Sequence, residues 1–137
     1  MTIAYETDGT LEPIEIALGL ALALAVGGLV GLERERHAHA VQKRSFGGAR
    51  TFPVLALLGA LTGLLAETHG PLVLVAGLLA VAGLLAVGHL QARTTPDAGP
   101  LGLTTEFAAL LVFVLGPLPF VALPGLTFPQ RLLLAGA

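Results

Sequence analysis

Four long stretches of this chain contain no Asp, Glu, Lys, Arg or His. They are residues 16–32, 51–66, 70–88 and 107–130. A helix needs roughly 20 residues, within a range of about 17–25, to cross the hydrocarbon core of a bilayer. With their flanking residues all four stretches qualify, and because backbone groups cannot stay unpaired in lipid, they must form helices or a closed barrel. The sequence shows no strict alternation of polar and apolar residues, which argues against the barrel.

The composition leaves two alternatives to a membrane protein. Only 12% of the 137 residues are charged, against about 25% in a typical soluble domain, and the mean hydropathy is +0.87. One alternative, a very apolar soluble core, would have to hide more apolar surface than a domain of this size can bury. The other, a cleaved signal peptide before a secreted domain, needs a basic start, and no Lys or Arg precedes Arg34.

We therefore predict an all-α polytopic membrane protein with four transmembrane helices and a possible truncated fifth. The expected parts are an acidic external N-terminus, a four-helix transmembrane domain and a C-terminal tail, at residues 1–12, 13–126 and 127–137. The four helices are expected at about 14–33, 50–67, 71–91 and 104–123.

The C-terminal region carries several prolines. Pro117, Pro119 and Pro124 break or end the fourth helix, and Pro129 suits the first turn of another one. We expect the tail either to lie at the membrane interface or to begin a truncated helix of a longer chain.

The basic residues orient the chain. Five of the seven Lys and Arg residues lie in 33–50 and one lies in 92–103, whereas residues 1–32 and 67–71 carry none. Short cytoplasmic loops are enriched in Lys and Arg. We expect the loops 33–50 and 92–103 to be cytoplasmic and the N-terminus to lie outside the inner (plasma) membrane.

Small residues recur at helical spacing in the first two predicted helices. These residues are Gly19, Ala23, Gly27 and Gly31 in the first helix, and Gly59 and Gly63 in the second. In lipid, small residues allow helix backbones to approach closely. The pattern predicts packing within the chain or, alternatively, a homodimer built on the first helix.

The first polar motif, in residues 33–51, allows four interpretations. Glu33 and Glu35 provide the oxygen ligands that a hard cation such as a divalent metal ion prefers. In the second interpretation, Arg34, Arg36 or Arg50 neutralises these acids in a structural ion-pair cluster. In the third, the segment is a solvated loop that faces lipid headgroups. The glycines at 47–48, next to Arg50 and Thr51, favour an anion such as a phospholipid headgroup, and the motif lacks the Lys-Ser/Thr of a nucleotide-binding loop.

Glu106 is the second polar candidate. It follows Thr104 and Thr105, which is typical of a capped helix start with an acid in the first turn. The functional alternative is a carboxylate that faces the bundle interior and marks an ion path. Asp97 lies on the same predicted side as Glu106 and is a further candidate.

The histidines give only a weak metal signal. His37 and His39 form an isolated pair that we expect in a flexible loop, and His69 and His89 are interpreted as interface residues. No nucleophile–base–acid set can be assembled, so we expect no enzyme. We also expect no nucleic-acid partner.

Two groups of motifs resemble a known family. The first is Gly-Leu-Val-Gly-Leu-Glu-Arg-Glu at 28–35 with Gly-Ala-Arg-Thr-Phe at 48–52 and Leu-Leu-Gly-Ala-Leu at 57–61. The second is Gly-Leu-Thr-Thr-Glu at 102–106 followed by Ala-Ala-Leu-Leu-Val-Phe at 108–113. Together they resemble the N-terminal transmembrane domain of the MgtC/SapB family, in the branch that continues into a further multi-helix domain.

The resemblance implies a bacterial inner-membrane protein associated with growth in low magnesium, with magnesium or another divalent cation as the possible ligand. The glycine-rich run near the third helix of the virulence-associated members is absent, so inhibition of the F-type ATP synthase is not carried over. The matching polar residues expected to matter are Glu33, Arg34, Glu35, Arg50, Thr51, Thr104, Thr105 and Glu106.

Two functions follow from these expectations. The first is ion transport in cation homeostasis, by a dimer because four helices leave little room for a pore, with Glu33, Glu35 and Glu106 as the metal site. The second is a non-transporting regulatory protein that binds a membrane partner through helix–helix contacts.

Overall fold

The computed structural model describes residues 12–41, 49–94, 103–120 and 128–136, and every regular element in them is a helix. The helices are α1 (Pro13–Val41), α2 (Thr51–His69), α3 (Leu72–Thr94), α4 (Leu103–Leu115) and α5 (Phe128–Gly136). This confirms the predicted all-α class.

Local sequence explains where the helices begin and end. Pro13 occupies the first position of α1, where its missing N–H costs nothing, and the Glu15 carboxylate accepts a hydrogen bond from the Glu12 N–H at 3.2 Å. Gly70 ends α2 with a φ of 86°, which a residue with a side chain rarely adopts, and its N–H donates to the Ala66 carbonyl at 2.8 Å. The chain then turns directly into α3.

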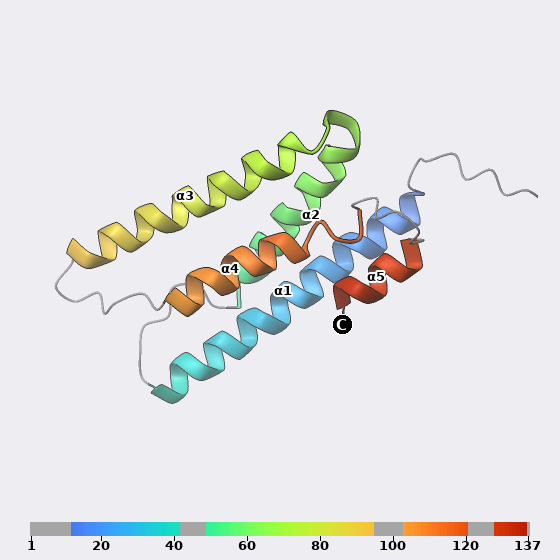
Figure 1. Ribbon diagram of the computed structural model, residues 1–137. Helices are drawn as coiled ribbons and strands as arrows, with labels where there is room; N and C mark the ends of the chain where they lie inside the picture. The colour runs from blue at the N-terminus through green and yellow to red at the C-terminus, as the bar shows by residue number, and fades with distance from the viewer. Residues whose placement is uncertain (1–11, 42–48, 95–102, 121–127, 137) are drawn as a thin grey trace, which may run out of the picture.

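The helices form an up-and-down bundle (Figure 1). α2 packs against α1, α3 and α4, and α5 lies along the first half of α1. α3 runs at the edge of the bundle, where only 11% of its apolar 18-residue window is buried. Most of its side chains therefore face outward.

Three helices are long and apolar enough to cross a membrane: Pro13–His37, Thr51–His69 and Leu72–Gln91. The chain is thus a membrane protein, and its described residues contain three candidate membrane-spanning helices. The predicted count of four is not confirmed, because α4 has only 13 residues. The predicted fourth helix, 104–123, was too long. The helix ends at Leu115 and residues 116–120 form turns, because Pro117 and Pro119 cannot continue a helix.

The segment 103–120 nevertheless follows α1 over most of its length. Its start contacts α1 at Arg34, and its end places the ring of Phe120 against Gly19. These α1 positions are about 22 Å apart at a rise of roughly 1.5 Å per residue. A short helix followed by turns therefore covers a distance comparable with a large part of a bilayer core.

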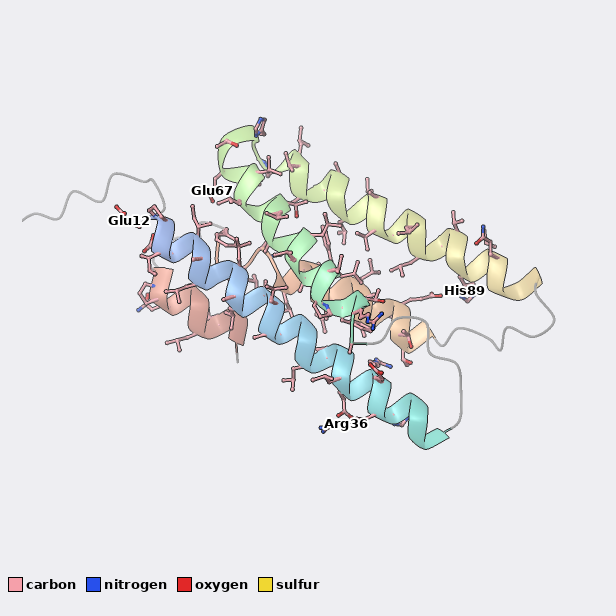
Figure 2. The ribbon with its side chains drawn as sticks, turned by 180° about the vertical axis from the view of Figure 1, so that it is seen from behind. Glu12, Arg36, Glu67 and His89 are labelled. Atoms are coloured by element: carbon pink, nitrogen blue, oxygen red, sulfur yellow. The ribbon has the colours of Figure 1, made fainter. Side chains whose placement is uncertain are left out.

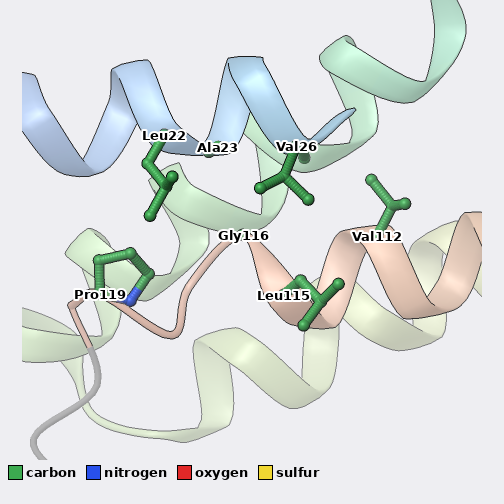
Figure 3. A pocket seen from close by; sticks show the side chains of 8 residues that line it. Leu22, Ala23, Val26, Val112, Leu115, Gly116 and Pro119 are labelled. Atoms are coloured by element: carbon green, nitrogen blue, oxygen red, sulfur yellow. The ribbon is translucent and has the colours of Figure 1, made fainter. Parts of the chain in front are cut away.

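In the centre of the bundle the chain packs closely at glycine residues. A Cβ added at Gly59 would meet the Phe113 carbonyl, and one added at Gly63 would lie 2.6 Å from Cβ of Pro117. Gly116 lies against the α2 backbone in the same way. Figure 3 shows the pocket between Gly116 and Pro119 on one side and Leu22 and Ala23 of α1 on the other, and this pocket is too narrow for a water molecule. Small residues thus bring three backbones together.

The first small-residue row is also occupied within the chain. A Cβ at Gly27 would lie 2.6 Å from the Phe52 carbonyl and 2.7 Å from Cα of Pro53. Ala23 and Gly31 are buried as well. Gly19, Gly27, Gly59 and Gly63 thus make close contacts within the chain. The homodimer interpretation stays a prediction.

Candidate functional site

The polar residues gather at one end of the bundle, where α1 and α3 end and α2 and α4 begin. Figure 2 shows Arg36 and His89 toward this end and Glu12 and Glu67 toward the other. We call this end the polar end. Its residues come from both groups of sequence motifs, although these are about 70 residues apart in the chain.

Arg34 joins the two groups of motifs. Its guanidinium donates a hydrogen bond to the Thr104 backbone carbonyl at 3.1 Å. α1 continues to Val41 rather than ending near residue 33 as predicted, since the residues from Glu33 onward favour helix. The extra turns place Arg34 on a rigid helix beside the start of α4.

Glu35 is tied to the start of α2. Its carboxylate accepts a hydrogen bond from the Ala49 N–H at 3.1 Å, and the Arg50 side chain provides no cap for the helix. A negative charge is favourable beside the positive end of a helix. Part of the anion-binding capacity that the sequence indicated near residues 47–51 is thus satisfied by a carboxylate of the chain itself.

Glu106 pairs with a residue that sequence reasoning did not assign to the site. Nδ1 of His89 and Oε1 of Glu106 lie 2.6 Å apart, and the two side chains are 20% and 17% exposed. The signal for His89 was present in the sequence. Gly77, Val81, Leu85 and His89 repeat every fourth residue, which places His89 on the face of α3 that meets α4.

The three predicted metal ligands do not meet. Glu35 bonds to Ala49, Glu106 pairs with His89, and Glu33 is exposed. Over the described ranges no three His, Cys, Asp or Glu side chains gather in a way that could hold a metal ion. A cation site built from Glu33, Glu35 and Glu106 stays a prediction.

The remaining candidates have separate positions. His37 lies exposed on α1, so its predicted place in a flexible loop was wrong. Thr104 and Thr105 belong to the first turn of α4, with Thr105 partly buried. Asp97, Pro124 and the glycines at 47–48 lie outside the described residues, as do the side chains of His39 and Arg93.

An apolar cavity of about 70 Å³ lies beside the polar end, between α2, α3 and α4. Eight residues line it: Thr51, Phe52, Leu55, Val81, Leu84, Leu85, Thr105 and Ala109. Two of them, Thr51 and Thr105, belong to the motif residues that the sequence singled out. We call this space the α3 cavity.

Comparison with known proteins identifies the family. The chain matches the MgtC family over residues 20–128. It belongs to the MgtC family. No curated protein and no solved structure gives a significant match. Membership indicates a membrane protein connected with magnesium homeostasis, and it agrees with the resemblance seen in the motifs at 28–61 and 102–113.

Proposed function

We propose that this MgtC-family chain is an inner-membrane regulatory protein in magnesium-linked homeostasis. It acts through helix contacts with a membrane partner, and neither carries ions nor catalyses a reaction. In this proposal the polar end is cytoplasmic, because it holds Arg34, Arg36 and Arg50 and cytoplasmic ends are enriched in basic residues.

The close packing of the bundle centre is the observation that carries the proposal. Gly59 lies against the Phe113 carbonyl, Gly63 against Pro117, and Gly116 against Ala56 and Ala60. A buried hydroxyl in this region, that of Thr62, donates to the Gly59 carbonyl at 2.7 Å. A hydrated cation would have to separate these backbones, which supports a role outside transport.

The outer face of α3 is the surface proposed for the partner. Leu72, Leu79 and Leu84 on this helix are 67–78% exposed. Because apolar side chains gain little from each other in lipid, such a face binds another helix through shape and close contact. α3 is also the spanning helix with the least burial in the chain itself.

Site-specific photocrosslinking in cells tests this function. A photoreactive residue is placed at Leu79 on the outer face of α3, and at Leu29 of α1, which is 71% exposed, as the control. We expect one protein adduct at Leu79 whose yield changes between low and high magnesium, and no such change at Leu29. Adducts with lipid alone at both positions and both magnesium levels would contradict the proposal.

Transport by a dimer is the second candidate, and one observation favours it. The His89–Glu106 pair is titratable, largely buried and located where a spanning helix ends, and such groups tend to mark ion paths in membranes. Under this alternative, Glu106→Gln abolishes a magnesium flux in vesicles that the unmodified chain supports. Under the proposed function there is no flux to abolish.

A further inference from the structure

The α3 cavity has the dimensions and lining of an apolar binding site. Its volume is about 70 Å³, whereas roughly 10–15 Å³ is enough to hold one water-sized group. Six of the eight lining residues are apolar, so a water molecule there would find few hydrogen-bond partners. The cavity therefore suits a short run of methylene groups.

The cavity exists because α3 touches α4 at two separated places. At one of them, a Cβ added at Gly77 would lie 3.0 Å from the Phe113 ring and 3.0 Å from the Thr62 methyl group. At the other, His89 pairs with Glu106. Between them α3 presents Val81 and Leu85 to the space. Leu84 also lines the cavity and is 69% exposed, so the cavity reaches the membrane-facing surface.

A basic residue directly precedes one of the lining residues of this cavity in the chain. Thr51 lines the cavity and Arg50, the preceding residue, is exposed at the start of α2. Arg34 and Glu35 at the same end bond to Thr104 and Ala49. Among the described residues, Arg50 takes part in no hydrogen bond or ion pair, which leaves its charge available for a ligand.

We propose that the α3 cavity and Arg50 together bind one anionic phospholipid of the surrounding bilayer. One acyl chain enters the cavity between Leu55, Val81 and Leu85, and Arg50 pairs with the headgroup phosphate. An apolar slot at the end of the bundle where α2 begins with the exposed Arg50 is complementary to an amphiphile with a negative head. A basic side chain is attracted to an anionic membrane surface, and buried methylene groups add to this attraction.

Photolabelling of the full chain in vesicles tests the proposal. Two probes carry the same photoreactive acyl chain, one on phosphatidylglycerol and one on phosphatidylcholine, and mass spectrometry maps the labelled residues. We expect the anionic probe to label residues 51–55 and 81–85 at least threefold more than the neutral probe does. At Leu111, an outward residue of α4 that is 59% exposed, we expect equal labelling.

Two variants with matched controls sharpen the test. Arg50→Gln removes the excess labelling by the anionic probe, whereas Arg36→Gln, at another exposed arginine of the polar end, keeps it. Ala109→Leu fills the cavity and lowers labelling by both probes at 81–85, whereas Leu111→Phe does not. If Ala109→Leu fails to fold, as judged by its helical circular dichroism, the Arg50→Gln comparison still decides.

Three results would overturn the proposal. Equal labelling by the two probes would show that the cavity does not select a headgroup. An unchanged excess in Arg50→Gln would show that Arg50 does not hold the phosphate. Labelling of 51–55 and 81–85 by neither probe would show that no acyl chain enters the cavity.

Discussion

The bundle centre and the α3 edge are built in opposite ways. In the centre, α1, α2 and α4 meet through glycines that touch backbone atoms, such as Gly27 at Phe52 and Gly59 at Phe113. At the edge, the contacts of α3 are made by side chains, among them Phe113 and Thr62 at Gly77 and the His89–Glu106 pair, with a cavity between these two places. Backbone contacts cannot yield without moving a helix, whereas side-chain contacts can. The centre therefore acts as a fixed frame, and α3 is the helix that a partner or a lipid can shift.

The largest effect is expected from a methyl group in the centre. Gly59→Ala places a Cβ on the Phe113 carbonyl, and we expect it to lower the free energy of unfolding by about 2–3 kcal/mol, as overpacking does. Gly83→Ala on α3 has nothing within 4 Å of its Cβ and should gain about 0.5 kcal/mol through helix propensity. Denaturant unfolding in micelles, followed by circular dichroism, measures both. Equal effects would remove the contrast between centre and edge.

The next effect concerns the attachment of α3. Glu106→Gln replaces the carboxylate that pairs with His89, and we expect it to cost about 1 kcal/mol, the typical net contribution of one hydrogen bond. The chain has no cysteine, so spin labels at Val87→Cys and Phe107→Cys report the distance between α3 and α4 by pulsed electron resonance. A broader and longer distance distribution is expected in Glu106→Gln. Glu67→Gln, exposed at the opposite end, should leave the distribution unchanged, and an unchanged distribution in Glu106→Gln would contradict the account.

A smaller effect is expected at the link between the two motif groups. Arg34→Ala removes the hydrogen bond to the Thr104 carbonyl, which is exposed, and should cost about 0.5–1 kcal/mol. Amide hydrogen exchange in the first turns of α4 should rise with it. Arg36→Ala serves as the control, with no such rise expected. Identical exchange in the two variants would show that Arg34 does not support α4.

The smallest effect is expected on the outer face of α3. Leu79 is 67% exposed. Shortening its side chain should remove few contacts within the protein, because lipid chains surround it. Leu79→Ala should change the free energy of unfolding by less than about 0.5 kcal/mol, in the same micelle assay. A loss comparable with that of Gly59→Ala would mean that the outer face of α3 is packed inside an assembly.

Sequence reasoning predicted much of the frame. The uncharged stretches predicted the helical class, and the spacing of Gly19, Gly27, Gly59 and Gly63 predicted close packing, since both depend on local patterns that a bilayer makes strict. It overestimated the fourth helix, because the effect of Pro117 on the helix depends on which contacts replace the lost hydrogen bonds.

The partners within the site were harder to predict. Arg34 with Thr104 and His89 with Glu106 are separated by 70 and 17 residues, and pairing at such distances follows from helix packing rather than from local pattern. His89 was visible only as the last residue of an otherwise apolar repeat. The cavity could not be predicted, because it depends on the distance between α3 and α4.

Magnesium flux into sealed vesicles tests the central claim most directly, namely that the bundle is closed to ions and the chain regulates rather than transports. Vesicles with the full chain are loaded with a magnesium-sensitive dye and compared with protein-free vesicles and with vesicles that hold Glu106→Gln, under a magnesium gradient with and without a pH gradient. The account predicts the same slow influx in all three. An influx that only the unmodified chain supports, and that Glu106→Gln abolishes, would contradict it.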